Sequence, residues 1–325
     1  MVLIYIGYIV LGLLLLIKGG DSLIDGSVEI AKRAKLSSMV IGITVIGFGT
    51  SMPELLVSTK AALIGSPGLA IGNVVGSNIA NIALILGVTA IMRPLTADKM
   101  ALVRDLPFMM LSVILLVIVG MSGTIHRWEG FVFITLLFIY VAYQIKTSRN
   151  SENVNAEDET AEQELPVMPL WKSSLIVIIS IAALIAGANM LIKGSSEIAM
   201  TLGTALGVEV SSMERIIGLT IVSVGTSLPE LTATVMAARK NQADMALGNI
   251  IGSVSFNILC VVGMASAVCP IYHADRGFFF DYMVMLSLAP ILWLFLYTER
   301  KLVRYEGWIL TIFYVLYIAR TLLIV

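Results

Sequence analysis

Charged residues are scarce in this sequence. Only 13% of the 325 residues are Asp, Glu, Lys or Arg, whereas 58% are hydrophobic and the mean hydropathy is +0.94. Soluble domains have about 25% charged residues, so most of the surface of this protein must face lipid. The formal net charge of −1 also lacks the basic excess of nucleic-acid-binding proteins, which argues against a nucleic-acid partner.

Histidine and cysteine are almost absent. The chain has two of each, and their positions, at Cys260, Cys269, His126 and His273, show neither the spacing of a zinc site nor a disulfide framework. The sequence also shows no pattern that would pair a nucleophile with a base. We therefore expect no prosthetic group and no enzymatic activity.

Long apolar segments, in contrast, fill most of the chain. Ten are long enough to span a bilayer as helices, at about 2–25, 38–63, 69–92, 103–122, 129–146, 173–193, 215–238, 245–269, 279–298 and 306–324. The one clearly polar stretch, Thr147 to Glu164, lies between the fifth and sixth segments. The sequence therefore predicts an all-α polytopic membrane protein. Its units are a five-helix repeat at 1–147, an acidic linker at 148–170 and a second five-helix repeat at 171–325.

Basic residues concentrate on one side of the predicted membrane. If Met1 is outside, 14 of the 21 lysines and arginines fall in inner loops, within 32–35, 93–104, 146–172, 239–240 and 300–304. Cytoplasmic loops carry an excess of Lys and Arg. We therefore expect a multi-pass protein of the cell membrane, with both termini outside and the linker in the cytoplasm.

Two motifs occur twice in the chain. Gly-Thr-Ser-Met-Pro-Glu at Gly49–Glu54 returns as Gly-Thr-Ser-Leu-Pro-Glu at Gly225–Glu230. Gly-Asn-Val-Val-Gly-Ser at Gly72–Ser77 returns as Gly-Asn-Ile-Ile-Gly-Ser at Gly248–Ser253, again 176 positions later. Because each half has five spans, an odd number, the second half enters the bilayer upside down. Ten helices in two inverted-topology repeats would bring the equivalent motifs together near the midplane.

The first motif places a carboxylate and two hydroxyls inside an apolar helix. Thr50, Ser51 and Glu54 are spaced to share one helix face. Pro53 removes a backbone hydrogen bond and predicts a kink in the helix. Backbone carbonyls left unpaired at membrane depth are tolerated where they line a cavity or bind an ion.

The polar groups of both motifs are all hard oxygen donors, which favour calcium or sodium over zinc or copper. A carboxylate at the bilayer centre costs at least about 2.5–3.5 kcal/mol, so each glutamate needs a cation or a proton. Single polar residues in membrane helices usually make interhelical hydrogen bonds, but that does not account for two matching glutamate motifs. The predicted ligands are Glu54, Glu230, Thr50, Ser51, Ser77, Asn81, Thr226, Ser227, Ser253 and Asn257.

Other polar residues are harder to place. Asn73 and Asn249 either support the ligands from behind or make close helix contacts, and both interpretations stay open. Asp21, Asp25 and Glu29 are spaced by four residues near the predicted inner interface, and we interpret them as a solvated stripe.

The duplicated motifs resemble the two alpha-repeats of the calcium/cation antiporter superfamily, specifically its prokaryotic sodium/calcium exchangers. The resemblance covers nearly the whole chain. It implies a site made by the second, third, seventh and eighth helices, with Glu54 and Glu230 shared between calcium and sodium and the carbonyls of Gly47 and Ser223 as further ligands. It also implies that the first and sixth helices slide against this core, a motion that Gly19, Gly20 and Gly187 could ease.

We therefore expect a secondary active antiporter that exchanges calcium for sodium, with these two ions and membrane lipid as its partners. One chain completes the site, so a monomer suffices. A calcium/proton antiporter and a potassium-dependent sodium/calcium exchanger remain alternatives. Asn257 makes a potassium-dependent exchanger less favoured, because such exchangers carry Asp at this position. Asn81 and Asn257 make a calcium/proton antiporter less favoured, because those exchangers have a further acid in the motif of the third and eighth helices. A channel would need no counter-ion and typically surrounds a pore with several subunits.

Overall fold

The computed structural model describes residues 2–158, 168–205, 223–272 and 277–324, which are almost entirely helical. Segments labelled η are π-helical turns within or at the start of longer helices. The first half contains, in chain order, α1 (Val2–Ala34), α2 (Ser38–Ile41), η1 (Gly42–Ile46), α3 (Gly47–Thr50), α4 (Met52–Leu63), α5 (Pro67–Ile79), η2 (Ala80–Ile85), α6 (Leu86–Met92), β1 (Leu95–Thr96), η3 (Ala101–Asp105), α7 (Leu106–Met121), β2 (Thr124–Ile125) and α8 (Arg127–Asp158).

The second half repeats most of this order. It contains α9 (Leu170–Ala205), α11 (Ser223–Thr226), α12 (Leu228–Arg239), α13 (Ala243–Phe256), η5 (Asn257–Val262), α14 (Gly263–Val268), β3 (Ile271–Tyr272), α15 (Gly277–Glu299), β4 (Lys301–Leu302) and α16 (Arg304–Ile324). Helices α3 and α4 recur as α11 and α12, each shifted by 176 positions. Counterparts of α2 and η1 would fall within 206–222, outside the described residues.

Seven helices in the described ranges are long and apolar enough to cross a membrane. The bent pair Ser38–Thr50 and Met52–Leu63 makes an eighth if it forms one span. These eight coincide with the first six, the eighth and the ninth of the ten predicted spans. The seventh lies partly outside the described residues, and the tenth is the 21-residue helix α16. The total of ten therefore stays a prediction.

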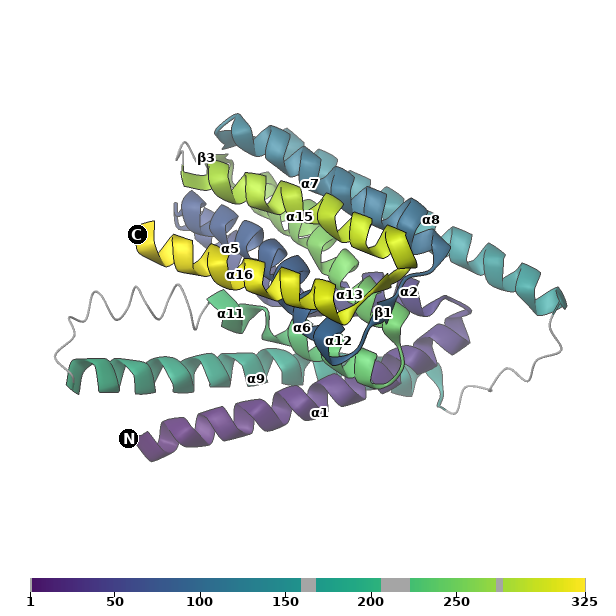
Figure 1. Ribbon diagram of the computed structural model, residues 1–325, viewed down its shortest axis with the longest axis horizontal. Helices are drawn as coiled ribbons and strands as arrows, with labels where there is room; N and C mark the ends of the chain where they lie inside the picture. The colour runs from purple at the N-terminus through teal and green to yellow at the C-terminus, as the bar shows by residue number, and fades with distance from the viewer. Residues whose placement is uncertain (1, 159–167, 206–222, 273–276, 325) are drawn as a thin grey trace.

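The predicted linker begins as helix. α8 continues past the expected end of the fifth span to Asp158 and runs beyond α7 in Figure 1. The rest of the predicted acidic segment, at 159–167, lies outside the described residues.

The kink predicted at the first motif is present. The helix axis turns by 46° between Ser38–Thr50 and Met52–Leu63. Ser51 stands at the break with φ −83° and ψ 4°, and Pro53 follows in the first turn of α4. Ser227 has nearly the same conformation, with φ −89° and ψ 7°, before α12. Because proline lacks an N–H to donate, the preceding helix ends and a new one begins, at Met52 and at Leu228. Each glutamate therefore lies in the first turn of a new helix.

The centre of the protein is formed by two long helices that each contain a π-helical turn, Pro67–Met92 and Ala243–Val268. The most apolar windows of these spans are 78% and 83% buried, whereas no other of the seven described spans exceeds 44%. These two helices carry the second motif of each half. The sequence therefore places its amide and serine groups in the most enclosed part of the bundle.

α1 and α9 lie side by side along one edge of the molecule (Figure 1) and meet through a seam of small residues. A Cβ added at Gly12 would lie only 2.8 Å from the carbonyl oxygen of Gly187. Contacts recur at seven-residue intervals, which pairs Gly12 with Gly187, Gly19 with Ser180 and Gly26 with Ser173. Small residues let apolar helices approach this closely, so α1 and α9 pack as a pair.

Only one of the three glycines that the sequence associated with sliding faces the core. Gly19 and Gly187 belong to the α1–α9 seam, whereas Gly20 contacts Thr232 and Met236 of α12. A role for these glycines in motion stays a prediction.

Short antiparallel ladders join the two halves. β1 pairs with β4 and β2 pairs with β3, so each ladder takes one strand from each half. The helices that flank these ladders also pack against helices of the other half: Gly87 of α6 packs on Gly307 of α16, and Gly130 of α8 packs on Gly263 of α14. The halves are thus interlocked around the central helices.

Candidate cation site

Glu54 and Glu230 lie in the first turns of α4 and α12, with both side chains fully buried. In each, Oε2 has no hydrogen-bond partner among the described residues. Neither glutamate takes part in the ion pairs that Arg104 and Lys240 make with Asp105, Asp21 and Asp25. Two buried carboxylates therefore each present one uncommitted oxygen.

The glutamates contact hydroxyl groups that come from two directions. Ser51 Oγ, next to the break in the first half, lies 3.4 Å from Glu230 Oε1 of the second half. Ser77 Oγ on α5 lies 3.4 Å from Glu54 Oε1. The motifs of the two halves, expected from the sequence to meet, are brought together here.

A second group of oxygens converges where α3 packs against α13. Thr50 Oγ1 lies 3.4 Å from Gly47 O and 3.4 Å from Ser253 Oγ, and Ser253 Oγ lies 3.5 Å from Gly47 O. The close approach depends on Gly252, where a Cβ would lie 2.4 Å from the carbonyl oxygen of Ile43. One carbonyl and two hydroxyls thus form a nearly equilateral triangle.

The equivalent group in the second half is less completely described. Ser223 begins α11, and Thr226 at the end of α11 is half-buried. Ser227 is buried, and its Oγ has no hydrogen-bond partner within the described ranges. The proposed contribution of the Ser223 carbonyl stays a prediction.

The oxygen–oxygen distances at these positions are long for hydrogen bonds. They are 3.3–3.5 Å, the shortest being between Thr50 Oγ1 and Asn249 Oδ1, whereas O–H···O bonds cluster at about 2.7–2.8 Å. Nearby buried hydroxyls reach the usual distance: Thr234 Oγ1 is 2.7 Å from Glu230 O, and Ser255 Oγ is 2.8 Å from Ile251 O. The helices therefore hold the site hydroxyls apart from their neighbours.

Asn81 is the second residue of the π-helical turn η2, Asn257 is the first residue of η5, and both are fully buried. Neither amide atom of Asn81 has a hydrogen-bond partner among the described residues, and the same holds for Asn257 Oδ1. Asn257 Nδ2 donates to Asn78 Oδ1 at 3.1 Å. This bond fixes the amide so that its oxygen is left free.

Asn78 was not among the predicted site residues. It is fully buried, and the position 176 residues later is Val254, so the pair breaks the repeat. Asn78 directly follows the duplicated motif, where the repeat ends, so its polar side chain in an apolar run is the only sequence signal that could have identified it.

The roles of Asn73 and Asn249 are now distinguishable. Asn73 Nδ2 donates to Ser58 Oγ at 2.9 Å and lies 3.4 Å from the carbonyl oxygen of Glu54. Asn249 Nδ2 makes the equivalent contacts, at 2.9 Å with Thr234 Oγ1 and 3.3 Å with Glu230 O. Each amide therefore holds the backbone of a glutamate from behind, which favours the supporting role over simple helix contact.

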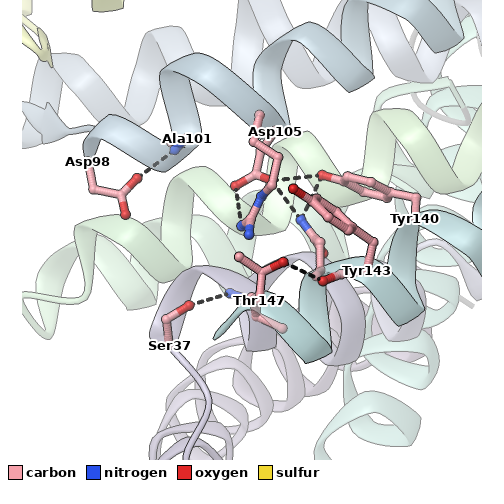
Figure 2. Close-up of polar contacts among 10 residues, drawn as sticks. Ser37, Asp98, Ala101, Asp105, Tyr140, Tyr143 and Thr147 are labelled. Carbon is pink, nitrogen blue, oxygen red and sulfur yellow. Dashed lines mark hydrogen bonds and ion pairs between the residues drawn. The ribbon is translucent and has the colours of Figure 1, made fainter. Parts of the chain in front are cut away.

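Asp105 is also a buried acid, but unlike Glu54 and Glu230 it has a basic partner (Figure 2). Its carboxylate pairs with Arg104 at 2.6 and 3.0 Å and accepts hydrogen bonds from Tyr140 Oη at 3.1 Å and Gln144 Nε2 at 2.8 Å. The protein itself neutralises this charge and uses it to join α7 to α8. By comparison, the lack of a described basic partner at Glu54 and Glu230 stands out as a property of the site.

The expected solvated stripe on α1 is only partly present. Asp21 and Asp25 are exposed, but both pair with Lys240 Nζ, at 2.8 and 2.7 Å. Glu29 is only 8% exposed, and its carboxylate accepts a hydrogen bond from Met168 N, so the solvated interpretation is wrong for this residue. The acids instead tie α1 to the loop after α12 and to the residues before α9.

Comparisons with known proteins agree with this arrangement. The sequence model of the family described as sodium/calcium exchanger protein matches residues 4–146 and 172–323. Sodium/calcium exchanger MaX1 of Methanosarcina acetivorans is 32% identical over 349 residues, covering 95% of this chain and 96% of MaX1. Inner membrane protein YrbG of Escherichia coli is 33% identical over 291 residues, covering 87% of this chain and 86% of YrbG.

A solved structure shares the fold of the whole chain. It is that of the sodium-calcium exchanger NCX_Mj soaked with 10 mM Na+ and 10 mM Sr2+, with a TM-score of 0.83 and 32% sequence identity. The match covers 98% of this chain and 99% of the other. The similarity thus includes both glutamate motifs and the helices that surround them.

Proposed function

Because the chain belongs to the sodium/calcium exchanger family, we propose that it exchanges calcium for sodium, with Glu54 and Glu230 shared between the two ions. The family consists of membrane transporters and not of enzymes, and the apolar helices agree with a multi-pass membrane protein. In the proposed cycle, calcium leaves the cell as sodium enters, and the site faces the two sides of the cell membrane alternately.

The observation that carries the proposal is the pair of uncommitted carboxylate oxygens on Glu54 and Glu230. Two buried carboxylates carry a charge of −2, which one calcium ion or two sodium ions neutralise. Leaving such charges bare within a membrane is costly. The empty site therefore resists crossing the membrane, and exchange proceeds without a leak.

The spacing of the hydroxyls supports cation binding over hydrogen bonding. A cation that binds oxygen at about 2.3–2.6 Å, as calcium does, holds two ligands at right angles about 3.3–3.7 Å apart. The distances of 3.4–3.5 Å among Gly47 O, Thr50 Oγ1 and Ser253 Oγ fall in this range. A site already opened to this spacing loses little energy in rearranging when an ion enters.

Coupling follows from competition for the same carboxylates. We assign sodium to the Gly47, Thr50 and Ser253 oxygens and to the places where Ser51 meets Glu230 and Ser77 meets Glu54. Calcium would take both carboxylates together, with the amide oxygens of Asn81 and Asn257 beside it. Since both loads require the glutamates, they cannot occupy the site at the same time.

The inverted arrangement of the halves is part of the proposal. The exchanged ladders, β1 with β4 and β2 with β3, are what a twofold axis between the halves would produce. The excess of Lys and Arg in the predicted inner loops supports an orientation with both termini outside the cell. An axis in the membrane plane would make the two faces of the site equivalent, as alternating access requires.

Flux measurements in proteoliposomes test the proposal. Sodium-loaded vesicles diluted into sodium-free medium should take up radioactive calcium, and dissipating the sodium gradient should stop this uptake. Glu54→Gln and Glu230→Gln should each abolish uptake, because the single remaining carboxylate cannot neutralise the +2 charge of a calcium ion. Glu299→Gln, which changes an exposed acid at the end of α15, serves as the control. Calcium uptake driven by a proton gradient alone would favour a calcium/proton antiporter, and a requirement for potassium would favour a potassium-dependent exchanger.

A further inference from the structure

A groove on the surface of the helix bundle is lined by residues outside the two glutamate motifs. It has a volume of about 580 Å³, within the range of about 300–1,000 Å³ typical of ligand sites. One wall is formed by η3, the residues before it and the start of α7, with Lys99, Leu102, Val103 and Pro107. The other is formed by the end of α15 and the residue after it, with Trp293, Tyr297 and Arg300. The groove therefore combines apolar walls with two cations.

Both charged residues that line the groove are basic. The acids nearest to Lys99 in sequence are engaged, because Asp98 Oδ1 accepts a hydrogen bond from Ala101 N at 2.6 Å and Asp105 pairs with Arg104 (Figure 2). Glu299, next to Arg300, is exposed and does not line the groove. Lys99 and Arg300 make no ion pair in the described part of the chain. The groove thus has an electrostatic preference for an anion.

The walls of the groove are held in place by the fold. The β1–β4 ladder pairs Thr96 with Lys301, and Ala97 N donates to Arg300 O at 2.9 Å. These contacts keep the two basic loops next to each other. Trp293 Nε1 donates to the Leu102 carbonyl at 3.1 Å and bridges the two helices. The site is therefore formed before any ligand arrives.

The exposed side of the groove faces the region where lipid is expected. Val103 is 68% exposed and Tyr297 is 61% exposed, on helices apolar enough to span a membrane. Trp293 stacks on Tyr297 with ring centroids 5.0 Å apart, and such aromatic residues gather at membrane–water interfaces. Basic pockets between transmembrane helices on the cytoplasmic side bind lipid headgroups.

We propose that this groove binds one anionic phospholipid, with its phosphate between Lys99 and Arg300 and an acyl chain along Leu102, Val103 and Pro107. The lipid comes from the leaflet beside the β1–β4 ladder, which is the cytoplasmic leaflet if basic loops lie inside. A soluble phosphate would use only the two cations and would leave the apolar walls uncovered. Since α7 and α15 belong to different halves, the lipid bridges them.

Native mass spectrometry of the full chain tests this assignment. The protein in detergent is titrated with phosphatidylglycerol and, separately, with phosphatidylcholine carrying the same acyl chains. Phosphatidylglycerol should bind more tightly. Lys99→Gln combined with Arg300→Gln should weaken its binding about 30-fold, from about 1 kcal/mol for each cation near an anionic headgroup. Val103→Trp, which fills the groove, should weaken the binding of both lipids.

Matched variants separate charge from loss of fold. Lys146→Gln removes an exposed cation of α8 that does not line the groove, and it should leave binding unchanged. Lys99→Arg with Arg300→Lys keeps both charges and should retain the preference for phosphatidylglycerol. Equal binding of the two lipids, unchanged binding by the double glutamine variant, or full competition by glycerol phosphate without acyl chains would each overturn the proposal.

Discussion

Ser51 Oγ lies 3.4 Å from Glu230 Oε1, although 179 residues separate the two in the chain. Ser51 occupies the break in one half, and Glu230 begins the helix after the break in the other. The proposed ion site is therefore shared between halves at the level of single contacts. Movement of one half relative to the other would change the ligands that an ion meets.

Replacing Ser51 with alanine should weaken sodium binding and leave the fold intact. The variant removes an oxygen beside a carboxylate, and polar contacts with charged groups contribute about 1.5–3 kcal/mol. Sodium affinity should therefore fall by about 10-fold or more. The measurement is the sodium concentration that half-inhibits calcium binding to the purified protein.

Ser255→Ala provides the matched control for this prediction. Its hydroxyl is also buried in the central region, but it donates to the Ile251 carbonyl of its own helix at 2.8 Å. Sodium inhibition should be unchanged in this variant. Equal losses in Ser51→Ala and Ser255→Ala would assign the effect to helix packing and remove Ser51 from the site.

Asn78→Val should lower calcium affinity by releasing the amide of Asn257. In the native protein Asn257 Nδ2 donates to Asn78 Oδ1, which leaves Asn257 Oδ1 free. Without this acceptor, the amide must leave its donor unsatisfied, at about 1–3 kcal/mol, or turn its oxygen away. Isothermal titration calorimetry with calcium measures the change.

Met285→Leu is the control for the Asn78 variant. Met285 Sδ is 3.8 Å from Asn78 Nδ2, and the change removes this weak contact without touching the bond to Asn257. Calcium affinity should stay within about twofold of the native value, because leucine replaces methionine with little loss of packing. A loss equal to that of Asn78→Val would show that Asn78 acts through packing alone.

Gly252→Ala should disturb the triangle of Gly47, Thr50 and Ser253. The new Cβ would lie 2.4 Å from the carbonyl oxygen of Ile43, so η1 must move away from α13. Overpacking of this kind costs about 1–3 kcal/mol, and it separates Ser253 from Gly47. Thermal unfolding should show the loss of stability, and sodium should stabilise this variant less than the native protein.

Gly7→Ala tests whether the effect depends on position. Gly7 lies on the exposed face of α1, and a Cβ there meets no described atom within 4 Å. Alanine also favours helix by about 1 kcal/mol relative to glycine. Stability should be equal or higher, and sodium stabilisation should be unchanged. A normal sodium response in Gly252→Ala would contradict the role assigned to this close approach.

The sequence predicts local features better than contacts between distant segments. Pro53 is enough to predict a kink in the helix, which the structure shows as a bend of 46°, because a missing N–H acts within one turn. The burial of Glu54 and Glu230 followed from apolar runs on both sides of each. These features depend on covalent chemistry and hydropathy, which the local sequence contains.

Other contacts could not be predicted in this way. Lys240 pairs with Asp21 and Asp25 across more than 200 positions, and nothing near those acids indicates a partner. Their four-residue spacing is equally typical of a solvated face. The only sequence signal for Asn78 is a polar side chain in an apolar run, where the equivalent position, Val254, is apolar. Where two segments meet depends on the packing of all helices.

The final prediction concerns stability and uses a pair of acids related by the repeat. Asp105→Ala should lower the free energy of unfolding by about 3–5 kcal/mol, because it removes a fully buried carboxylate and leaves the partly buried Arg104, whose side chain is 12% exposed, without its partner. Asp281, 176 residues later, is half-buried and accepts one side-chain bond, from Tyr317 Oη at 2.9 Å, so Asp281→Ala should cost about 1 kcal/mol. Thermal unfolding in detergent compares them. Equal losses of unfolding free energy in the two variants would mean that water solvates Arg104 once Asp105 is removed. The network in Figure 2 would then contribute little to joining α7 and α8.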